Sequence, residues 1–408
     1  MEKEFITIRE KETAVRIQNT NINAIRTKDI VKKGLRVYKD GKIGISGAIG
    51  DIFDQALVDN AIENLSADIS YPYDLSANLK DHRNYSKEKI SSNELANLAE
   101  EILKRLREEY SDFDFSESIN TKEITVSMKN TQGLDLEYKD AYMALGLILK
   151  EKKSANVFDG FLQYYGRSFD KDKFWQFNEE LLAAYRKKVS LPEGETLPVF
   201  MFDFSELDNF LSRSLNGELY ATGSSLFSNK MGEKLFNEKI TIQQNRDPFH
   251  SAQPFFDMEG VVLEGDSYNL IEKGRLVNVY TDKRTAHTYN LPHTGAASGA
   301  YDGMPTLMRA PLRFVVDSDD IKAALNGQMA ILVAVCSGGD FTSDGSFAAP
   351  VQVGFLFDGQ RIIGKLPEFT MRSHLYKLLG EDYIGTFPNK HLYIGDGILL
   401  QGYNMTIV

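Results

Sequence analysis

Histidine and cysteine are the side chains with which this sequence could bind a catalytic metal or form a nucleophile, and both are scarce. The chain holds one cysteine and six histidines, at positions 82, 250, 287, 293, 374 and 391. A catalytic zinc ion takes three protein ligands and keeps one position open. In many metallopeptidases one helix supplies two histidine ligands. No helix between residues 83 and 249 can do so, because that interval contains no histidine.

The other chemical signals in the sequence are equally weak. His287 and His293 lie six residues apart with Pro292 between them, so we expect two polar loop residues rather than a ligand pair. Cys336 follows the apolar run "ILVAV", which favours a buried small hydrophobic residue over a nucleophile. G-x-S-x-G, P-loop, H-E-x-x-H and Cys-x-x-Cys motifs are all absent. No catalytic motif therefore assigns a reaction to this chain.

Composition limits the classes of function. A chain of 408 residues, 42% of them hydrophobic, is long enough for two or three domains. Its formal net charge of −11 argues against nucleic-acid binding, which needs clustered Lys and Arg. One cysteine cannot form an internal disulfide, and no signal peptide or apolar run of membrane-spanning length is visible. We expect a cytoplasmic protein with no membrane partner.

The first half of the chain alternates between strand and helix patterns. Asp40-Gly41 predicts a type I′ hairpin over 34–47. Strands are predicted at 122–130 and 134–150, and an irregular connection at 66–91. Helices are predicted at 51–67, with Phe53, Leu57, Ala61, Ile62 and Leu65 on one face, at 91–110 with Ser92 as N-cap, and at 172–188.

The second half is rich in strands separated by Gly-containing turns. The stretch "VSLPEGETLP" at 189–198 interrupts both periodicities and marks the expected boundary. We therefore predict an α+β protein with an N-terminal domain at 1–190, whose lobes span about 1–80 and 92–188. A β-rich, mostly antiparallel C-terminal domain is predicted at 191–408.

Several segments of the C-terminal half occur in the order found in one protein family. They are "LFSNKMGEKL" at 226–235, "FDMEG" at 256–260, "IEKGRLVNVYTDKRTA" at 271–286, "HTG" at 293–295 and "CSGGDFTSDGSF" at 336–347. The sequence thereby resembles the TldD/PmbA family, also called TldD/TldE and once labelled modulators of DNA gyrase. The N-terminal segments "GLRVYKDGKIGISGA" and "NTQGLDLEYKDAYMALGLILK" extend the resemblance over nearly the whole chain.

The resemblance implies a metal site that this sequence does not reproduce. Active members of the family hold zinc through an H-E-x-x-x-H helix and a cysteine near the C-terminus. The matching helix here, "SELDNFLSRSLNGELY", has no histidine, and the C-terminal position near Gly395 and Asp396 has no cysteine. Asp208, Asn209 and Arg213 occupy the helix instead. The match is therefore closer to the TldE/PmbA branch, and we assign no catalytic or metal-binding residue.

Two hypotheses follow from this resemblance. In the first, the chain is a non-catalytic subunit of a TldD-type metallopeptidase complex that acts on unfolded or modified peptides, inactive alone, with zinc only in the catalytic partner. A degenerate site or peptide cleft would then be lined by Asp208, Asn209, Arg213, Gly395 and Asp396. The alternative for the helix that contains the first three is that it has no special role. The expected assembly is a homodimer, or a heterodimer with a TldD-like zinc peptidase. In the second hypothesis the chain is a free-standing metallopeptidase with dispersed ligands such as His250, His287, His293 and His391.

Overall fold

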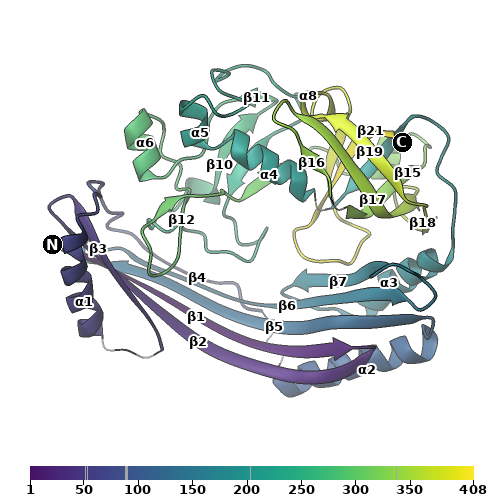
Figure 1. The fold of residues 1–408 in the computed structure, drawn as a ribbon, viewed down its shortest axis with the longest axis horizontal. Coiled ribbons are helices and arrows are strands. Elements are labelled where there is room, and N and C mark those ends of the chain that lie inside the picture. Colours follow the sequence, from purple (N-terminus) through teal and green to yellow (C-terminus); the bar gives the residue numbers. More distant parts are fainter. Residues whose placement is uncertain (51, 53, 88–90, 203, 337) are drawn as a thin grey trace.

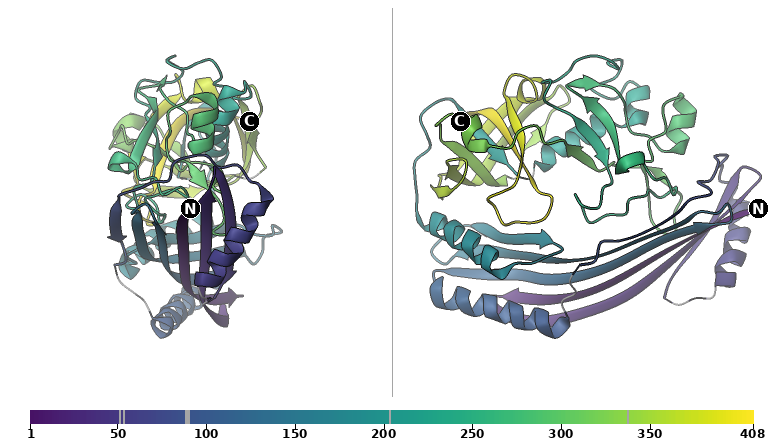
Figure 2. Two further views of the ribbon diagram at one scale, coloured as in Figure 1. Left: turned by 90° about the vertical axis from the view of Figure 1, so that its left-hand side faces the viewer. Right: turned by 180° about the vertical axis from the view of Figure 1, so that it is seen from behind.

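The computed structural model describes residues 1–50, 52, 54–87, 91–202, 204–336 and 338–408. A long curved sheet from the first part of the chain lies under a C-terminal half of shorter strands and helices, and its concave face is turned toward that half (Figure 1). The same arrangement is seen from behind and from the side in Figure 2. The fold is α+β, with mostly antiparallel sheets and a β-rich C-terminal half.

In the described part of the chain, seven strands form the curved sheet in the order β3-β2-β1-β5-β6, with β4 and β7 both beside β6. All neighbours are antiparallel except β4 and β6. The strands are β1 (Glu2–Gln18), β2 (Asn21–Lys39), β3 (Lys42–Ile49), β4 (Lys80–Asn84), β5 (Phe113–Asn130), β6 (Asp135–Glu151) and β7 (Gly160–Gly166). Because β1 pairs with β5, strands from both predicted lobes share this one sheet.

The predicted hairpin at 34–47 is confirmed. Strands β2 and β3 pair up to Lys39 and Lys42, and the two residues between them, Asp40 and Gly41, have φ angles of 51° and 73°. A type I′ turn needs positive φ at both central positions, which Asp-Gly adopts at low cost.

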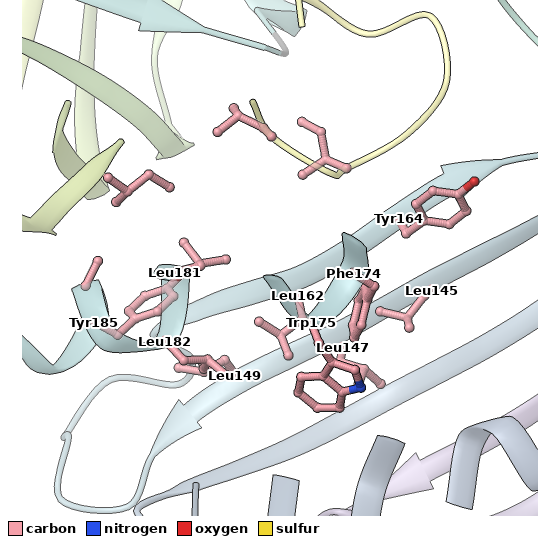
Figure 3. Packing of buried hydrophobic residues seen from close by; sticks show 14 of the residues in the cluster. Leu145, Leu147, Leu149, Leu162, Tyr164, Phe174, Trp175, Leu181, Leu182 and Tyr185 are labelled. Carbon is pink, nitrogen blue, oxygen red and sulfur yellow. The ribbon is translucent and has the colours of Figure 1, made fainter. Parts of the chain in front are cut away.

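Three helices pack on the N-terminal sheet. They are α1 (Asp54–Glu63, continued by a 3-10 turn at Asn64–Ala67), α2 (Ser92–Glu109) and α3 (Lys171–Arg186). α2 and α3 lie side by side, with the Arg105 guanidinium 4.3 Å from the Trp175 ring centroid. Figure 3 shows α3 residues such as Phe174 and Leu182 packed on leucines of β6 and β7. Apolar residues at helical spacing in these helices therefore pack against the sheet, as predicted.

Details of the first half differ from the sequence-based expectation. The N-cap of α2 is Ser91, not Ser92, because Ser91 and Glu94 form a reciprocal capping box. Ile62 of α1 is 38% exposed although the pattern placed it on the apolar face, and Phe53 lies outside the described residues. The segment 66–91 contains the short strand β4, whose sequence "KDHRN" carries no apolar alternation to reveal it.

The C-terminal half holds a second large sheet, in which eight strands are described, in the order β15-β8-β21-β19-β17-β16, with β18 beside β17 and β20 beside β21. Its strands are β8 (Thr196–Met201), β15 (Ala330–Cys336), β16 (Asp340–Phe341), β17 (Ser346–Phe357), β18 (Ile362–Lys365), β19 (Phe369–His374), β20 (Tyr383–Pro388) and β21 (Leu399–Ile407). Only the β8–β15 pair in this list is parallel. The chain crosses from the first sheet to the second between α3 and β8, and the domain division at residue 190 stays a prediction.

Smaller elements complete the C-terminal half. A four-stranded sheet consists of β9 (Ile242–Asn245), β10 (Ser267–Glu272), β11 (Arg275–Leu276) and β14 (Leu312–Phe314), and a two-stranded one of β12 (Ala297–Ser298) and β13 (Thr306–Leu307). The helices are α4 (Ser205–Ser214), α5 (Gly217–Ala221), α6 (Lys283–Tyr289), α7 (Ile321–Leu325) and α8 (Leu375–Leu378), with a 3-10 turn at Glu264–Asp266. None of the helices in the described ranges is long and apolar enough to cross a membrane.

Candidate functional site

The helix for which the resemblance predicts the position of the zinc helix is α4, and its polar side meets an arginine. Asp208 Oδ2 lies 3.8 Å from Arg309 Nη2, and Arg309 Nη1 donates a hydrogen bond to Asn209 Oδ1. Arg213 is exposed in the last turn, where a cation is favoured by the helix dipole. The predicted residues of α4 therefore form a mixed polar surface with two guanidinium groups.

This set of side chains does not fit a zinc ion. Zinc in catalytic sites takes imidazole, thiolate and carboxylate ligands, and α4 offers only the carboxylates of Glu206 and Asp208, with no imidazole or thiolate. The Arg309 guanidinium 3.8 Å away already balances the Asp208 carboxylate and would repel a divalent cation. No step of a zinc reaction can be assigned to this helix.

The second predicted segment, Gly395 with Asp396, docks onto the N-terminal sheet. It belongs to the loop 389–398, which reaches from the C-terminal half to β7 (Figure 1). Asp396 Oδ2 accepts a hydrogen bond of 2.8 Å from the Arg167 amide, and the Asp396 amide donates to Tyr165 O at 3.0 Å. A Cβ at Gly395 would lie 2.4 Å from Tyr165 O, so only glycine allows this approach.

Aromatic contacts strengthen the same attachment. The rings of Tyr393 and Tyr164 stack with centroids 5.0 Å apart, and the Tyr393 hydroxyl accepts a hydrogen bond of 2.5 Å from the Asp170 amide. The structure thus places α4 and the 389–398 loop against different parts of the molecule. We call the second attachment the loop junction, which consists of Tyr164, Tyr165, Arg167, Tyr393 and Asp396.

The "FDMEG" segment at 256–260 forms a tight buried turn around one carboxylate. Asp257 Oδ1 accepts hydrogen bonds of 2.9 Å from the amides of Glu259 and Val261, and Oδ2 accepts one of 3.0 Å from the Ala297 amide. Burial and the nearby charge of Glu259 raise the pKa of Asp257. The Asp257 carboxylate therefore stabilises the turn by accepting these three main-chain hydrogen bonds.

The turn presents Glu259 to side chains from both halves of the chain. Glu259 Oε1 accepts a 2.7 Å hydrogen bond from the Tyr71 hydroxyl, and Oε2 accepts one of 3.0 Å from the Lys283 amide. His293 Nε2 lies 3.5 Å from Oε2. Burial opposes ionisation of Glu259, but the hydrogen bonds from His293, Tyr71 and Lys283 prevail and lower its pKa.

A buried ion pair lies on the other side of the same turn. Arg36 and Glu4, on β2 and β1, are 0% and 1% exposed, with 3.1 Å between Arg36 Nη1 and Glu4 Oε1. Arg36 also donates to the carbonyls of Met258 at 2.6 Å and Gly303 at 3.2 Å, and the Tyr38 hydroxyl donates to Glu4. We call Glu4, Arg36, Tyr71 and Glu259 the buried junction. It ties the turn to the N-terminal sheet, a role that the sequence did not reveal.

A groove lies beside the loop junction, between the concave face of the sheet and the C-terminal half. Its volume is about 740 Å³, and its lining includes Asn120 and Gly146 from the sheet and Phe202, Ile394 and Ile398 from the C-terminal half. Ligand sites commonly occupy such interfaces between domains, with volumes of about 300–1,000 Å³. The groove is therefore a candidate binding site.

The four histidines that could have formed a dispersed metal site are scattered. His250 lies 3.5 Å from Asp247, His293 contacts Glu259, and His391 is exposed in the 389–398 loop. His287 lies on α6 beside Tyr73, so the prediction that it is a loop residue was wrong. In the described ranges, no three His, Cys, Asp or Glu side chains gather as potential metal ligands.

Cys336 does not have the surroundings of a nucleophile. Its side chain is half-buried at the end of β15, and burial raises the pKa of its thiol to about 12. The thiol is therefore protonated at neutral pH, whereas a nucleophilic cysteine reacts as the thiolate.

Comparison with known proteins identifies the class. Residues 203–385 match the family described as the PmbA/TldA metallopeptidase C-terminal domain. The match places a domain of this metallopeptidase-related family in the C-terminal half of the chain. An uncharacterized protein of Methanocaldococcus jannaschii is 23% identical over 384 residues, which cover 89% of this chain and 86% of that protein.

Solved structures share the fold of the whole chain. TldE from Thermococcus kodakarensis superposes with a TM-score of 0.76 at 18% identity, over 100% of this chain and 96% of that one. A protein described as a candidate modulator of a DNA gyrase from Thermotoga maritima gives 0.76 at 17% identity, with the same coverage. A similarly described protein from Bacteroides thetaiotaomicron gives 0.75 at 15% identity, over 100% of this chain and 94% of that one.

Proposed function

We propose that this chain is a TldE/PmbA-like, non-catalytic subunit of a TldD-type metallopeptidase complex that acts on unfolded or modified peptides. The observation that carries the proposal is the polar side of α4, where Asp208 is paired with Arg309 and no imidazole or thiolate is offered. Zinc would then be held by the catalytic partner alone. The shared fold with TldE from Thermococcus kodakarensis supports the same assignment.

In this proposal the surface of α4 faces a peptide or the active site of the partner in a dimer. Arg213 and Arg309 are both exposed, and a guanidinium binds carboxylates through its planar fork of donors. Asn209 adds an amide that can donate to a peptide carbonyl. The subunit would contribute binding and positioning of peptide, and the partner would contribute hydrolysis.

The test is a peptidase assay on unstructured peptides with the purified chain, with and without added zinc, and again with a TldD-like relative from the same genome. We expect no cleavage and no stoichiometric zinc for the chain alone, and increased cleavage when both chains are present. Stoichiometric zinc together with zinc-dependent cleavage by the chain alone, lost in H293A, would overturn the proposal in favour of dispersed ligands.

Variants of α4 separate a partner surface from an incidental one. R213A combined with N209A should reduce the stimulation of the relative by about tenfold, since a charged hydrogen bond at an interface is lost. R284A, at an exposed arginine of α6, is the matched control and should stimulate like the unchanged chain. Equal stimulation by both variants would show that α4 has no such role.

A further inference from the structure

The groove beside the loop junction is open because its floor is built from small residues. Asn120 of β5 pairs with Ala144 of β6, and Ser118 pairs with Gly146. A Cβ added at Gly146 would meet no atom within 4 Å, so open space stands directly above this glycine. Gly146 also has no positive φ, which means that a turn or bulge does not explain its presence.

Large side chains enclose this floor. Phe161 and Tyr165 of β7, the strand paired with β6, line the groove together with Phe202, Ile394 and Ile398 of the C-terminal half. A narrower apolar crevice continues from Phe161, Phe202 and Ile394 toward α3. An occupant of the groove would therefore contact mainly aromatic and aliphatic carbon.

The polar groups of the groove point to the chemistry of that occupant. Glu117 is the one charged residue in the described lining, and it is paired with Arg16 at 3.2 Å. The Oδ1 atom of Asn120 is buried and has no hydrogen-bond donor in the described part of the chain. A buried acceptor without a donor is costly, and rotation of the Asn120 amide toward the groove would let a ligand N–H group satisfy its oxygen. The lining thus suits an uncharged group next to an amide.

We propose that this groove holds one large apolar side chain of an extended peptide, while the Asn120 amide turns toward the groove and its oxygen accepts a hydrogen bond from a peptide N–H. The inference rests on the proposed function, because it takes an unfolded peptide as the ligand, and it adds the place and the residue class that is selected. About 740 Å³ accommodates an aromatic side chain together with its flanking backbone. A charged side chain at the same position would be disfavoured because it would lose its hydration without a partner.

The experiment measures binding of two fluorescently labelled, unstructured peptides that differ only in a central Phe or Asp. The unchanged chain should bind the Phe peptide at least about tenfold more tightly. In G146W the indole occupies the space above the glycine, and the affinity for the Phe peptide should fall by at least about tenfold. T125W places the same ring on the opposite face of the sheet, on β5, and should bind like the unchanged chain. Thermal unfolding verifies that each variant is folded, and A144L replaces G146W if that variant is not.

Three results would overturn the inference, and they differ in their bearing on the proposed function. If folded G146W binds the Phe peptide as tightly as the unchanged chain, the peptide lies elsewhere and the subunit assignment stands. If the unchanged chain binds neither peptide, and it also fails to stimulate a catalytic relative, both the inference and the proposed function fail. Equal affinity for the Phe and Asp peptides would contradict apolar selection.

Discussion

The C-terminal half is attached to the N-terminal sheet at two places that differ in chemistry. The buried junction uses an ion pair with both partners at most 1% exposed, together with the hydrogen bonds of Glu259. The loop junction uses stacked rings, main-chain hydrogen bonds and the exposed residue Asp396. Charges removed from water are costly to leave unpaired, whereas aromatic and main-chain contacts lose little when one member changes. The buried junction therefore fixes the position of the C-terminal half on the sheet. The groove lies beside the second attachment, the loop junction.

The largest expected effect comes from breaking the buried ion pair on one side. R36M leaves Glu4 buried with an unbalanced charge, and Glu4 Oε2 has no hydrogen-bond partner in the described ranges even in the unchanged chain. The free energy of unfolding should fall by about 3–5 kcal/mol. Denaturant unfolding followed by fluorescence measures the loss.

The control for this variant is the double change E4Q with R36M. It leaves no charge at the junction, so it should recover part of the loss seen in R36M. A loss of under about 1 kcal/mol in R36M would mean that the pair is solvated in solution and that the two attachments do not differ as described.

A smaller effect is expected from the pH dependence of Glu259. Its folded-state pKa is below the ordinary value of 4.5, so its contribution to stability is complete above that pH and is lost as the pH falls through the folded pKa. E259Q removes this contribution, so its stability should be lower at neutral pH and should fall less steeply in acid. Thermal unfolding from about pH 7 to about pH 3 measures both slopes.

An exposed glutamate provides the comparison for E259Q. E264Q changes a residue in the 3-10 turn at 264–266, away from the hydrogen bonds of the buried junction, and should keep the profile of the unchanged chain. If E259Q follows the same acid profile as the unchanged chain, the hydrogen bonds of Glu259 do not stabilise its ionised form.

The smallest effect is expected at the loop junction. Y393F removes the hydroxyl that accepts a hydrogen bond from the Asp170 amide and keeps the ring stacked on Tyr164. The free energy of unfolding should fall by about 1 kcal/mol. Y289F on α6 serves as the matched Tyr-to-Phe change. A loss in Y393F as large as that in R36M would erase the distinction between the two junctions.

Sequence reasoning succeeded where the signal is local. Asp40-Gly41 specifies its turn through the φ angles of two adjacent residues, and α3 is visible from the spacing of Phe174, Leu181 and Leu182. The N-cap of α2 was missed by one position although Glu94, three residues after Ser91, marks the capping box.

The buried junction could not be predicted from the sequence. Glu4 stands in a charged N-terminal stretch that reads as solvent-exposed, and Glu259 is 1% exposed only because the turn at 256–260 folds against β1 and β2. The two glutamates come together through contacts between residues more than 180 positions apart. The candidate residues of α4 and the 389–398 loop came from the family resemblance, and their functional role stays a proposal.

The order of strands in the C-terminal sheet has a consequence for biosynthesis. β8 is the first strand of this sheet to be translated and β21 the last, yet they are hydrogen-bonded neighbours over six residue pairs. Met405 of β21 is 1% exposed, so the core remains open until this strand is in place. The sheet therefore cannot close while the ribosome is still making the chain, and β8 must wait through some 200 residues of synthesis before its final neighbour is available.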